Sequence, residues 1–308
     1  MSAESLPTNK LSTHDMAIFA SRGFVRLDAV VPTSLNDQFL EELERTFGVR
    51  EVNGGTTVPA VPAGTEIDQA LTSDQTLGQI MRLPRLKGAI ESLVGPNSLL
   101  DHHFVHVLPP ASAIEASGHA ANAQHLHQDS TIDVRKSFDI QLFYYPQEIT
   151  DDMGGTRYLP GSHLRIVNEA AIARYQNVRG QQHVVCPAGT VFLMHHGIWH
   201  GGSINRSERT RYLYKIRLNP TVPQVRLWDT TDLTDADSTQ LPIFFVRERQ
   251  DPDSVQNVLT RGEPWFEMDT GRIEFINRIH FWRRLLGDRT FDAHYWVSRL
   301  ECEPSIGE

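Results

Sequence analysis

The sequence predicts a mainly β fold with flanking helices, and three observations carry this prediction. Between about residues 100 and 218, short runs of β-forming residues alternate with Gly, Pro and Asn breaks. This pattern is typical of a β-sandwich or barrel rather than of a parallel α/β sheet. Helical periodicities lie on both sides of that region. The chain also lacks the GxGxxG, Walker and GxSxG motifs that mark common α/β enzymes.

The β-type runs are short and are separated by turn residues. They are His103 to Leu108, Phe138 to Tyr145, Arg157 to Leu159, His183 to Val185, Thr190 to Met194, and Arg211 to Leu218. Upstream, a short helix is expected to open after Ser12 or Thr13 and to stop at Gly23, because Ser and Thr cap helix N-termini and Gly ends helices. The apolar run 24–27 then indicates a strand, and apolar residues at helical spacing over 35–47 indicate a second helix.

Three segments are expected to be irregular. Asn53 to Ala63 is rich in Gly, Thr, Val and Pro, and Pro109 to Asn122 contains many small residues. Either could be a lid over a site, and a mobile surface connection is the alternative. After Pro220 an acidic segment lacks the glycine and glutamate of a calcium loop, so a solvated loop is expected there. Apolar stripes over 273–300 predict two further helices.

The composition is that of an ordinary globular chain. Of 308 residues, 40% are hydrophobic and 22% are charged, so a sizeable core can form. The net charge of −9 argues against a nucleic-acid partner, because phosphate binding needs an excess of Lys and Arg. Cys186 and Cys302 lie far apart without a zinc spacing, so neither a disulfide scaffold nor a zinc finger is expected.

The N-terminal segment has no apolar core of the kind that marks a secretory signal, and no stretch approaches the length that spans a bilayer. We therefore expect a cytoplasmic protein without a membrane partner. A single domain is expected over residues 1–308. Within it, residues of about 1–99 support a β core of about 100–220, and about 221–308 form a C-terminal loop and helices.

A metal site is predicted from the stretch His127-Gln128-Asp129. In a β-strand, residues two apart point to the same side, so His127 and Asp129 can reach one ion while Gln128 faces away. In a chain with 14 histidines this motif alone carries little weight. A second histidine at the end of a later strand, His200, would complete two imidazoles and one carboxylate, the set that activates oxygen at non-haem Fe(II). The alternatives to His200 are His125, His195 and His196.

Arg211 favours the choice of His200. A strand that returns from His200 to Arg211 can place a guanidinium beside the metal, where it would hold a carboxylate through two parallel hydrogen bonds. The plainer interpretation of Arg211 is a surface salt bridge. For the three metal ligands, the plainer interpretation is a set of hydrogen-bonded strand residues.

Taken in order, HQD at 127–129, GGTRYLPGSH at 154–163 and WHGGSINRSERTR at 199–211 resemble the phytanoyl-CoA dioxygenase family of Fe(II)/2-oxoglutarate-dependent oxygenases. The resemblance covers about residues 12 to 218. It implies a double-stranded β-helix, which is a jelly-roll or cupin-like core, with flanking helices. It also implies Fe(II), 2-oxoglutarate as cosubstrate, and O2, with stimulation by ascorbate.

The resemblance assigns iron ligation to His127, Asp129 and His200. It implies that Arg211 binds the far carboxylate of 2-oxoglutarate. Gln124 and Thr156 match positions that contact the cosubstrate in some relatives. Many relatives have serine two positions after the distal histidine, whereas this chain has Gly202 there and Ser203 next.

The implied reaction is the oxidation of an unactivated C–H bond of a small-molecule substrate, with release of succinate and CO2. Hydroxylation is the default outcome, and desaturation or cyclisation stay open. Asp129 argues against halogenation, because halogenating relatives have a small residue in its place. Two other classes compete. One is a non-catalytic jelly-roll protein that binds a small molecule, and the other is a metal-dependent hydrolase or isomerase, which lacks an evident general base beside the ligands.

Overall fold

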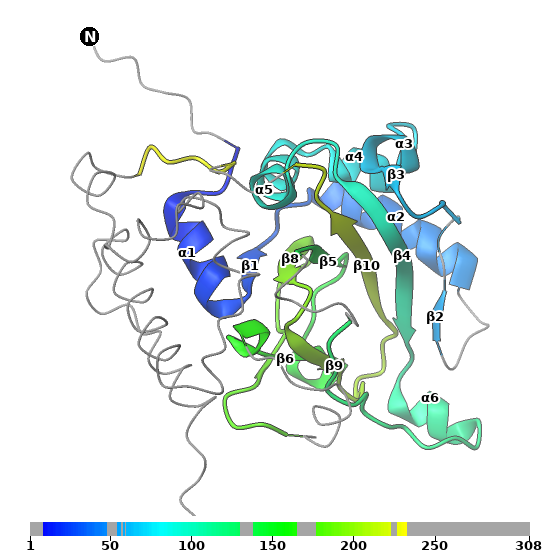
Figure 1. The fold of residues 1–308 in the computed structure, drawn as a ribbon. Coiled ribbons are helices and arrows are strands. Elements are labelled where there is room, and N and C mark those ends of the chain that lie inside the picture. The colour runs from blue at the N-terminus through cyan, green and yellow to red at the C-terminus, as the bar shows by residue number, and fades with distance from the viewer. Residues whose placement is uncertain are drawn as a thin grey trace, which may run out of the picture.

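The computed structural model describes residues 9–47, 54–56, 58, 60–129, 138–164, 177–222 and 227–232. Within them, two antiparallel sheets form the β core (Figure 1). The larger sheet contains β1 (Phe24–Leu27), β8 (Thr190–His195), β5 (Ile140–Tyr145), β10 (Arg211–Asn219), β4 (Leu99–Leu108) and β2 (Gly54–Thr56), in that order, and β3 (Thr65–Glu66) also pairs with β4. The smaller sheet contains β7 (Gln182–His183), β6 (Thr156–Leu159) and β9 (Trp199–Gly202).

Buried side chains join the two sheets. Phe143 of β5, Phe192 of β8 and Tyr158 of β6 belong to one hydrophobic cluster. Phe192 and Tyr158 meet edge to face with ring centroids 5.8 Å apart. The two sheets therefore share one core, and the mainly β fold that the sequence predicts is confirmed.

Helices cover the opposite side of the larger sheet. They are α2 (Thr33–Phe47), α3 (Ile67–Ala70), α4 (Thr76–Met81) and α5 (Pro84–Val94). Figure 1 shows them gathered around one end of β4 and β10, away from β6 and β9. Phe39 of α2 stacks on Tyr144 and meets Tyr214 edge to face, with centroid distances of 5.6 and 6.0 Å. These contacts fix α2 against β5 and β10.

Strand β10 shows how the two sides of the larger sheet differ, because successive residues point to opposite sides. The side chains toward the helices, here called the helix face, belong to the main hydrophobic core and are Tyr212, Tyr214, Ile216 and Leu218. The side chains toward the smaller sheet, here called the inner face, are Arg211, Leu213, Lys215 and Arg217. All eight are buried, so an alternating sequence that would suit a half-exposed strand is enclosed on both sides.

The N-terminal elements agree with the sequence predictions. Helix α1 (Thr13–Arg22) has Ser12 as N-cap in a capping box with Asp15. Gly23 ends the helix in a left-handed conformation with φ 85°, which glycine adopts without steric cost, and its N–H bonds Phe19 O. β1 and α2 follow where the sequence predicts them.

Two segments predicted as irregular contain regular structure. Within 53–63, β2 pairs with β4, because backbone pairing needs no side-chain pattern. Within 109–122, α6 (Ala111–Ala116) forms directly after Pro110, since alanine is the strongest helix former. The helices α3, α4 and α5 were not anticipated either, although Pro84 at the first turn of α5 is a local start signal. The predicted helices over 273–300 lie outside the described residues.

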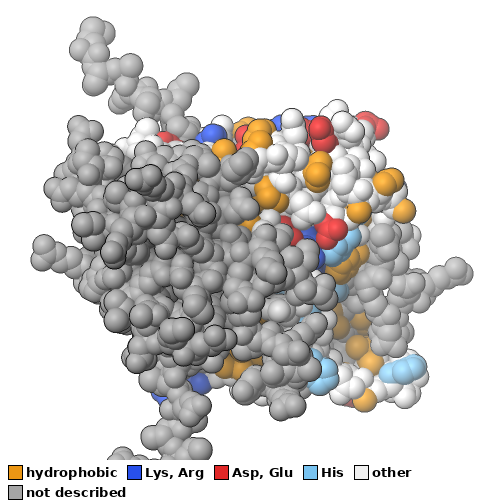
Figure 2. Space-filling model, viewed as in Figure 1, with side chains coloured by type: hydrophobic (Ala, Val, Ile, Leu, Met, Phe, Trp, Pro, Cys, Tyr) orange, Lys and Arg blue, Asp and Glu red, His pale blue; other side chains and the backbone are white. Residues whose placement is uncertain are grey.

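On the face that Figure 2 shows, the described residues carry hydrophobic side chains scattered among polar ones. Among the residues whose exposure the structure describes, Val185 is the one large hydrophobic residue that is exposed. None of the helices in these ranges has the length and apolar character that crossing a bilayer requires.

Candidate metal centre

His127, Asp129 and His200 come together on the inner face. Their ligand atoms all lie within 4.8 Å of one another, the one such group of three among the described residues. His127 Nε2 is 3.4 Å from Asp129 Oδ1, and His200 Nε2 is 3.2 Å from Asp129 Oδ2. Two ligand atoms at right angles about one ion, each about 2.1 Å from it, are about 3 Å apart. The group is therefore spaced as a metal site requires.

Backbone hydrogen bonds hold the two histidines side by side. His127 N donates to His200 O and His200 N donates to His127 O, both at 2.9 Å. His200 lies on β9, which pairs with β6 so that His200 faces Tyr158. The small sheet thus positions one ligand directly and the other through this bridge.

The predicted strand at residues 127–129 is not formed. His127 makes one isolated bridge and Asp129 lies at a bend. On the N-terminal side the backbone pairing is only partly kept. Gln124 N donates to Gly202 O at 2.9 Å, whereas Gly202 N donates to the Gln124 side chain at 3.0 Å and the Arg157 guanidinium donates to Gln124 O. The ligands still converge, because His127 is held by its bridge rather than by a ladder.

The hydrogen bonds of both imidazoles prepare Nε2 for a metal. His127 Nδ1 lies 2.9 Å from His125 O, and His200 Nδ1 lies 3.1 Å from Ile198 O. A carbonyl oxygen only accepts, so each Nδ1 carries the proton and Nε2 keeps its lone pair in the neutral ring. Burial lowers the pKa of His200 to about 4, which keeps this ring neutral at pH 7.

Arg211 lies on the same cavity wall at the first position of β10. It is 4% exposed, and its Nη1 donates to Gly154 O. Its Nε has no hydrogen-bond partner among the described residues. This burial rules out the surface salt bridge, and a buried guanidinium with an unused donor suits a carboxylate ligand.

All six predicted site residues line one cavity of about 120 Å³. Thr156 accepts a hydrogen bond from the Tyr145 hydroxyl at 2.8 Å, so its own proton remains available to a ligand. Ser203 instead lies near His183, at 3.4 Å from Nδ1, and is not part of the wall. The remaining lining residues are Phe104, His106, Phe143, Gly202, Leu213 and Lys215.

Lys215 is the main residue that the sequence analysis missed. Its ammonium contacts Asp129 Oδ2 although it is 3% exposed. Burial, together with Arg217, lowers the pKa of Lys215 to about 7, whereas the contacting carboxylate favours its charged form. The sequence does contain a signal for Lys215. Residues at even spacing along a strand point to the same side, so Lys215 lies on the same side of β10 as Arg211.

Of the alternative histidines, His125 contributes its backbone oxygen, 2.9 Å from His127 Nδ1, whereas His195 and His196 are buried away from the metal group. His196 Nδ1 lies 3.0 Å from Asp139 Oδ1, and Arg217 donates to Asp139 Oδ2 at 2.6 Å. These two partners lower the pKa of Asp139, although its burial acts in the opposite direction. His195 is fully buried, with its ring centroid 5.0 Å from that of His163. Neither histidine joins the metal group.

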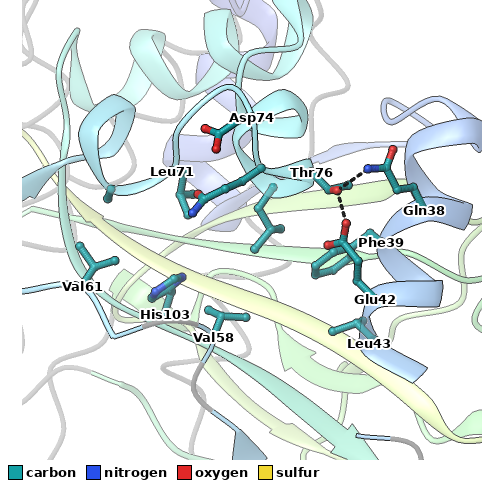
Figure 3. Close-up of a pocket in the computed structure, with 13 residues that line it drawn as sticks. Gln38, Phe39, Glu42, Leu43, Val58, Val61, Leu71, Asp74, Thr76 and His103 are labelled. Atoms are coloured by element: carbon teal, nitrogen blue, oxygen red, sulfur yellow. Dashed lines mark hydrogen bonds between the residues drawn. The ribbon is translucent and has the colours of Figure 1, made fainter. Parts of the chain in front are cut away.

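A larger cavity, of about 440 Å³, lies on the helix face (Figure 3). Its wall is mostly apolar, with Glu42 and Gln38 both hydrogen bonded to the Thr76 hydroxyl and His103 at its floor on β4. No metal-ligand group of three occurs there among the described residues. The smaller cavity is therefore the candidate site.

The model of the family described as phytanoyl-CoA dioxygenase (PhyH) matches residues 19–213, which is more than half of the chain. The chain belongs to the PhyH family. It is thus an Fe(II)/2-oxoglutarate-dependent dioxygenase, and its two sheets form the jelly-roll core of that family.

Solved structures are similar to this PhyH-family chain in fold. HygX from Streptomyces hygroscopicus, solved with nickel and 2-oxoglutarate bound, is 17% identical with a TM-score of 0.51 and covers 75% of this chain and 94% of its own. The non-heme alpha-ketoglutarate-dependent epimerase SnoN from nogalamycin biosynthesis is 17% identical with a TM-score of 0.50 and covers 67% of this chain and 82% of its own. No curated protein matches the sequence.

Proposed function

We propose that His127, Asp129 and His200 bind Fe(II), and that the enzyme hydroxylates an unactivated C–H bond of a small-molecule substrate. In balance, substrate, O2 and 2-oxoglutarate give hydroxylated substrate, succinate and CO2, with one oxygen atom entering each organic product. The observation that carries the proposal is the pairing of a prepared two-histidine, one-carboxylate group with a buried guanidinium on the same cavity.

The donor set fits ferrous iron. Two neutral imidazoles and one carboxylate occupy one side of an ion and leave other positions open, whereas a closed zinc site has four protein ligands. When bound with 2-oxoglutarate, iron supplies the O2-dependent oxidation that this family performs. The chain itself supplies the orientation of the ligands through the Nδ1 hydrogen bonds to His125 O and Ile198 O.

Arg211 is proposed to bind the far carboxylate of 2-oxoglutarate through Nε and a second N–H. Thr156 would add one hydrogen bond, because Tyr145 already donates to its oxygen and leaves its proton free to point at an acceptor. Gln124 is proposed to contribute its amide N–H groups, since its Oε1 is taken by Gly202 N. With glycine at 202, the serine contact of many relatives is absent.

The proposal is tested by 2-oxoglutarate turnover. Succinate release should depend on Fe(II), rise with ascorbate, and be lost in His127→Ala and His200→Ala. Anaerobic addition of Fe(II) and 2-oxoglutarate should give a weak visible charge-transfer band in the wild type alone. Turnover that survives without O2 would favour a hydrolase or isomerase instead, and a bound ligand without turnover would favour a binding protein.

The type of oxidation is read from the product. A succinate-release screen across pools of small molecules identifies a substrate. A product heavier by one oxygen then supports hydroxylation, whereas a product lighter by two hydrogens would replace it with desaturation or cyclisation.

A further inference from the structure

Lys215 places a buried ammonium inside the candidate metal centre. The ammonium contacts Asp129 Oδ2. It also lies 5.4 Å from the ring centroid of Phe104 and 5.3 Å from that of Phe143. Burying an ammonium is unfavourable unless it is paired and hydrogen bonded. The Asp129 carboxylate is the acidic partner within the described residues, and the aromatic rings enclose the rest of the charge.

Asp129 needs such a partner more than the two histidines do. It lies at a bend outside any strand, whereas His200 is on β9 and His127 is bridged to it. Its two carboxylate oxygens face different imidazoles, at 3.4 and 3.2 Å. Rotation about the Cβ–Cγ bond would therefore present either oxygen, or both, to an ion.

Strand β10 holds this ligand at two points. Lys215 contacts the carboxylate, and Arg217, two residues further along the same side of the strand, donates from Nη1 to Asp129 O at 3.2 Å. Arg217 is itself fixed by Asp139, to which Nη2 donates at 2.6 Å. The strand thereby restrains a ligand that has no strand of its own.

From this geometry, and resting on the proposed function, we propose that Lys215 is a positioning residue for the metal ligand Asp129. Its ammonium occupies one carboxylate oxygen, so that Asp129 binds the ion through the other lone pairs in a single orientation. Partners of this kind fix the direction of a metal ligand, and their loss weakens metal affinity by about 10- to 100-fold.

If only the charge of Lys215 mattered, removing it would change metal affinity in the opposite direction. A positive charge close to a divalent ion disfavours binding of that ion. If Lys215 served only to neutralise Asp129, its removal would strengthen metal binding. The sign of the change in affinity therefore separates the two roles.

The test uses Lys215→Met, which removes both charge and donor, and Lys215→Gln, which removes the charge and keeps an N–H donor. Co(II) replaces Fe(II), and its dissociation constant and visible absorption spectrum are measured without 2-oxoglutarate or substrate. The surface substitution Lys87→Met makes the same chemical change at a side chain that is 43% exposed. Thermal unfolding of each metal-free variant establishes that it is folded.

We expect Lys215→Met to weaken Co(II) binding by about 10- to 100-fold and to alter the spectrum, as loss of an outer partner does. Lys215→Gln and Lys87→Met should stay close to wild type. Equal or tighter binding in both Lys215 variants would overturn the inference. Unchanged metal binding with a selective loss of substrate-stimulated turnover would also overturn it, in favour of a substrate contact.

Failure of the proposed function gives a different result. Asp129→Ala should lose the Co(II) spectrum seen in the wild type. If the wild type shows no such spectrum, or if Asp129→Ala keeps it, then the metal assignment is wrong. If Asp129→Ala loses it while Lys215→Met keeps it with full affinity, only the role of Lys215 is wrong. Should Lys215→Met not fold, the Lys215→Gln affinity decides, because tighter binding there would show that charge alone matters.

Discussion

The two faces of the larger sheet are equally buried but differ in how their polar atoms are paired. On the helix face, the Tyr214 hydroxyl lies 2.9 Å from His103 Nδ1 and the Tyr144 hydroxyl donates to Asn36 at 2.6 Å. On the inner face, Arg211 Nε and Gln141 Oε1 have no partner among the described residues. Buried polar atoms left unpaired are rare, and Arg211 Nε lies on the cavity wall, where a ligand can complete it.

Cavity volume alone would favour the helix face as the location of the site. The helix-face cavity has about 440 Å³ and the inner-face cavity about 120 Å³. The smaller one contains the metal group, the guanidinium and a buried ammonium, whereas the larger one is lined mainly by apolar side chains. The contrast teaches that converging charged groups, and not volume, distinguish the candidate site from the other cavity.

Among changes that leave the metal group intact, the largest effect is expected from removing the guanidinium on the inner face. Arg211→Met should raise the KM for 2-oxoglutarate by roughly 100-fold, about 3 kcal/mol, because a buried carboxylate loses its charged partner. Steady-state succinate release against 2-oxoglutarate concentration measures this. A KM unchanged from wild type would mean that the unpaired Nε serves another ligand.

Acid sensitivity should come from His163, which is buried against the end of α1 with its Nε2 3.0 Å from Ala20 O. Burial lowers the pKa of His163 to about 4, with a smaller effect from His196 and opposed by the hydrogen bond to Ala20 O. Below about pH 6.5 the unfolded chain binds a proton that the folded chain does not bind until about pH 4. The free energy of unfolding should therefore fall with falling pH in this window, by up to about 1.4 kcal/mol per pH unit for this group.

His163→Gln should lower the slope of unfolding free energy against pH by about the contribution of one bound proton. Urea unfolding from pH 7 to 4 measures this slope. The slope is informative even if the substitution changes stability by a constant amount. The matched control is His119→Gln, which makes the same substitution at an exposed side chain. An unaltered slope in His163→Gln would contradict the assigned protonation.

Features that depend on local contacts could be predicted from the sequence, whereas features that depend on contacts between distant residues could not. Helix α1 was predictable because its capping box and Gly23 are signals within the segment itself. The site residues were predictable because His127, His200 and Arg211 sit in short motifs. The role of Lys215 was not, since its partner Asp129 is 86 positions away and only the folded register of β10 brings them together.

The irregular path at 124–129 was beyond local reasoning for a similar reason. The HxD spacing suggested a strand, yet the Gln124 side chain takes a backbone N–H of β9 that a strand residue would have used. Whether a side chain or a backbone group wins such a bond depends on tertiary packing. The motif predicted correctly that His127 and Asp129 lie close together, whereas the strand predicted for them does not form.

A matched pair of tyrosines tests the two faces directly. Tyr145 and Tyr214 are both fully buried, and each makes one hydroxyl hydrogen bond, to Thr156 and His103 respectively. Either Phe variant should lose about 1 kcal/mol of stability. Burial raises the pKa of Tyr145, so its hydroxyl stays protonated and keeps donating to Thr156.

Only Tyr145→Phe is expected to affect the cosubstrate. Loss of the Tyr145 hydroxyl leaves the Thr156 hydroxyl without a fixed orientation. The KM for 2-oxoglutarate should therefore rise about fivefold, or about 1 kcal/mol. Tyr214→Phe should leave KM unchanged. Equal KM values in the two variants would show that Thr156 does not contact 2-oxoglutarate.

The smallest effect is expected from restoring the missing hydroxyl at position 202. A Cβ added to Gly202 would lie 3.7 Å from Gln124 Oε1 and 3.8 Å from Arg211 Nη2, which are ordinary contacts. Gly202→Ser should therefore fold normally and place a hydroxyl beside the guanidinium, lowering the KM for 2-oxoglutarate by a few fold at most, since a neutral hydrogen bond contributes about 1 kcal/mol.

The neighbouring glycine supplies the control for this change. A Cβ at Gly201 would lie 2.7 Å from His125 O, so Gly201→Ser must push the bridged segment away from β9 and should weaken metal binding. If Gly202→Ser raised the KM for 2-oxoglutarate, the added hydroxyl would not donate to the carboxylate that Arg211 is proposed to bind. A neutral Gly201→Ser would show that the bridged segment can shift without weakening metal binding.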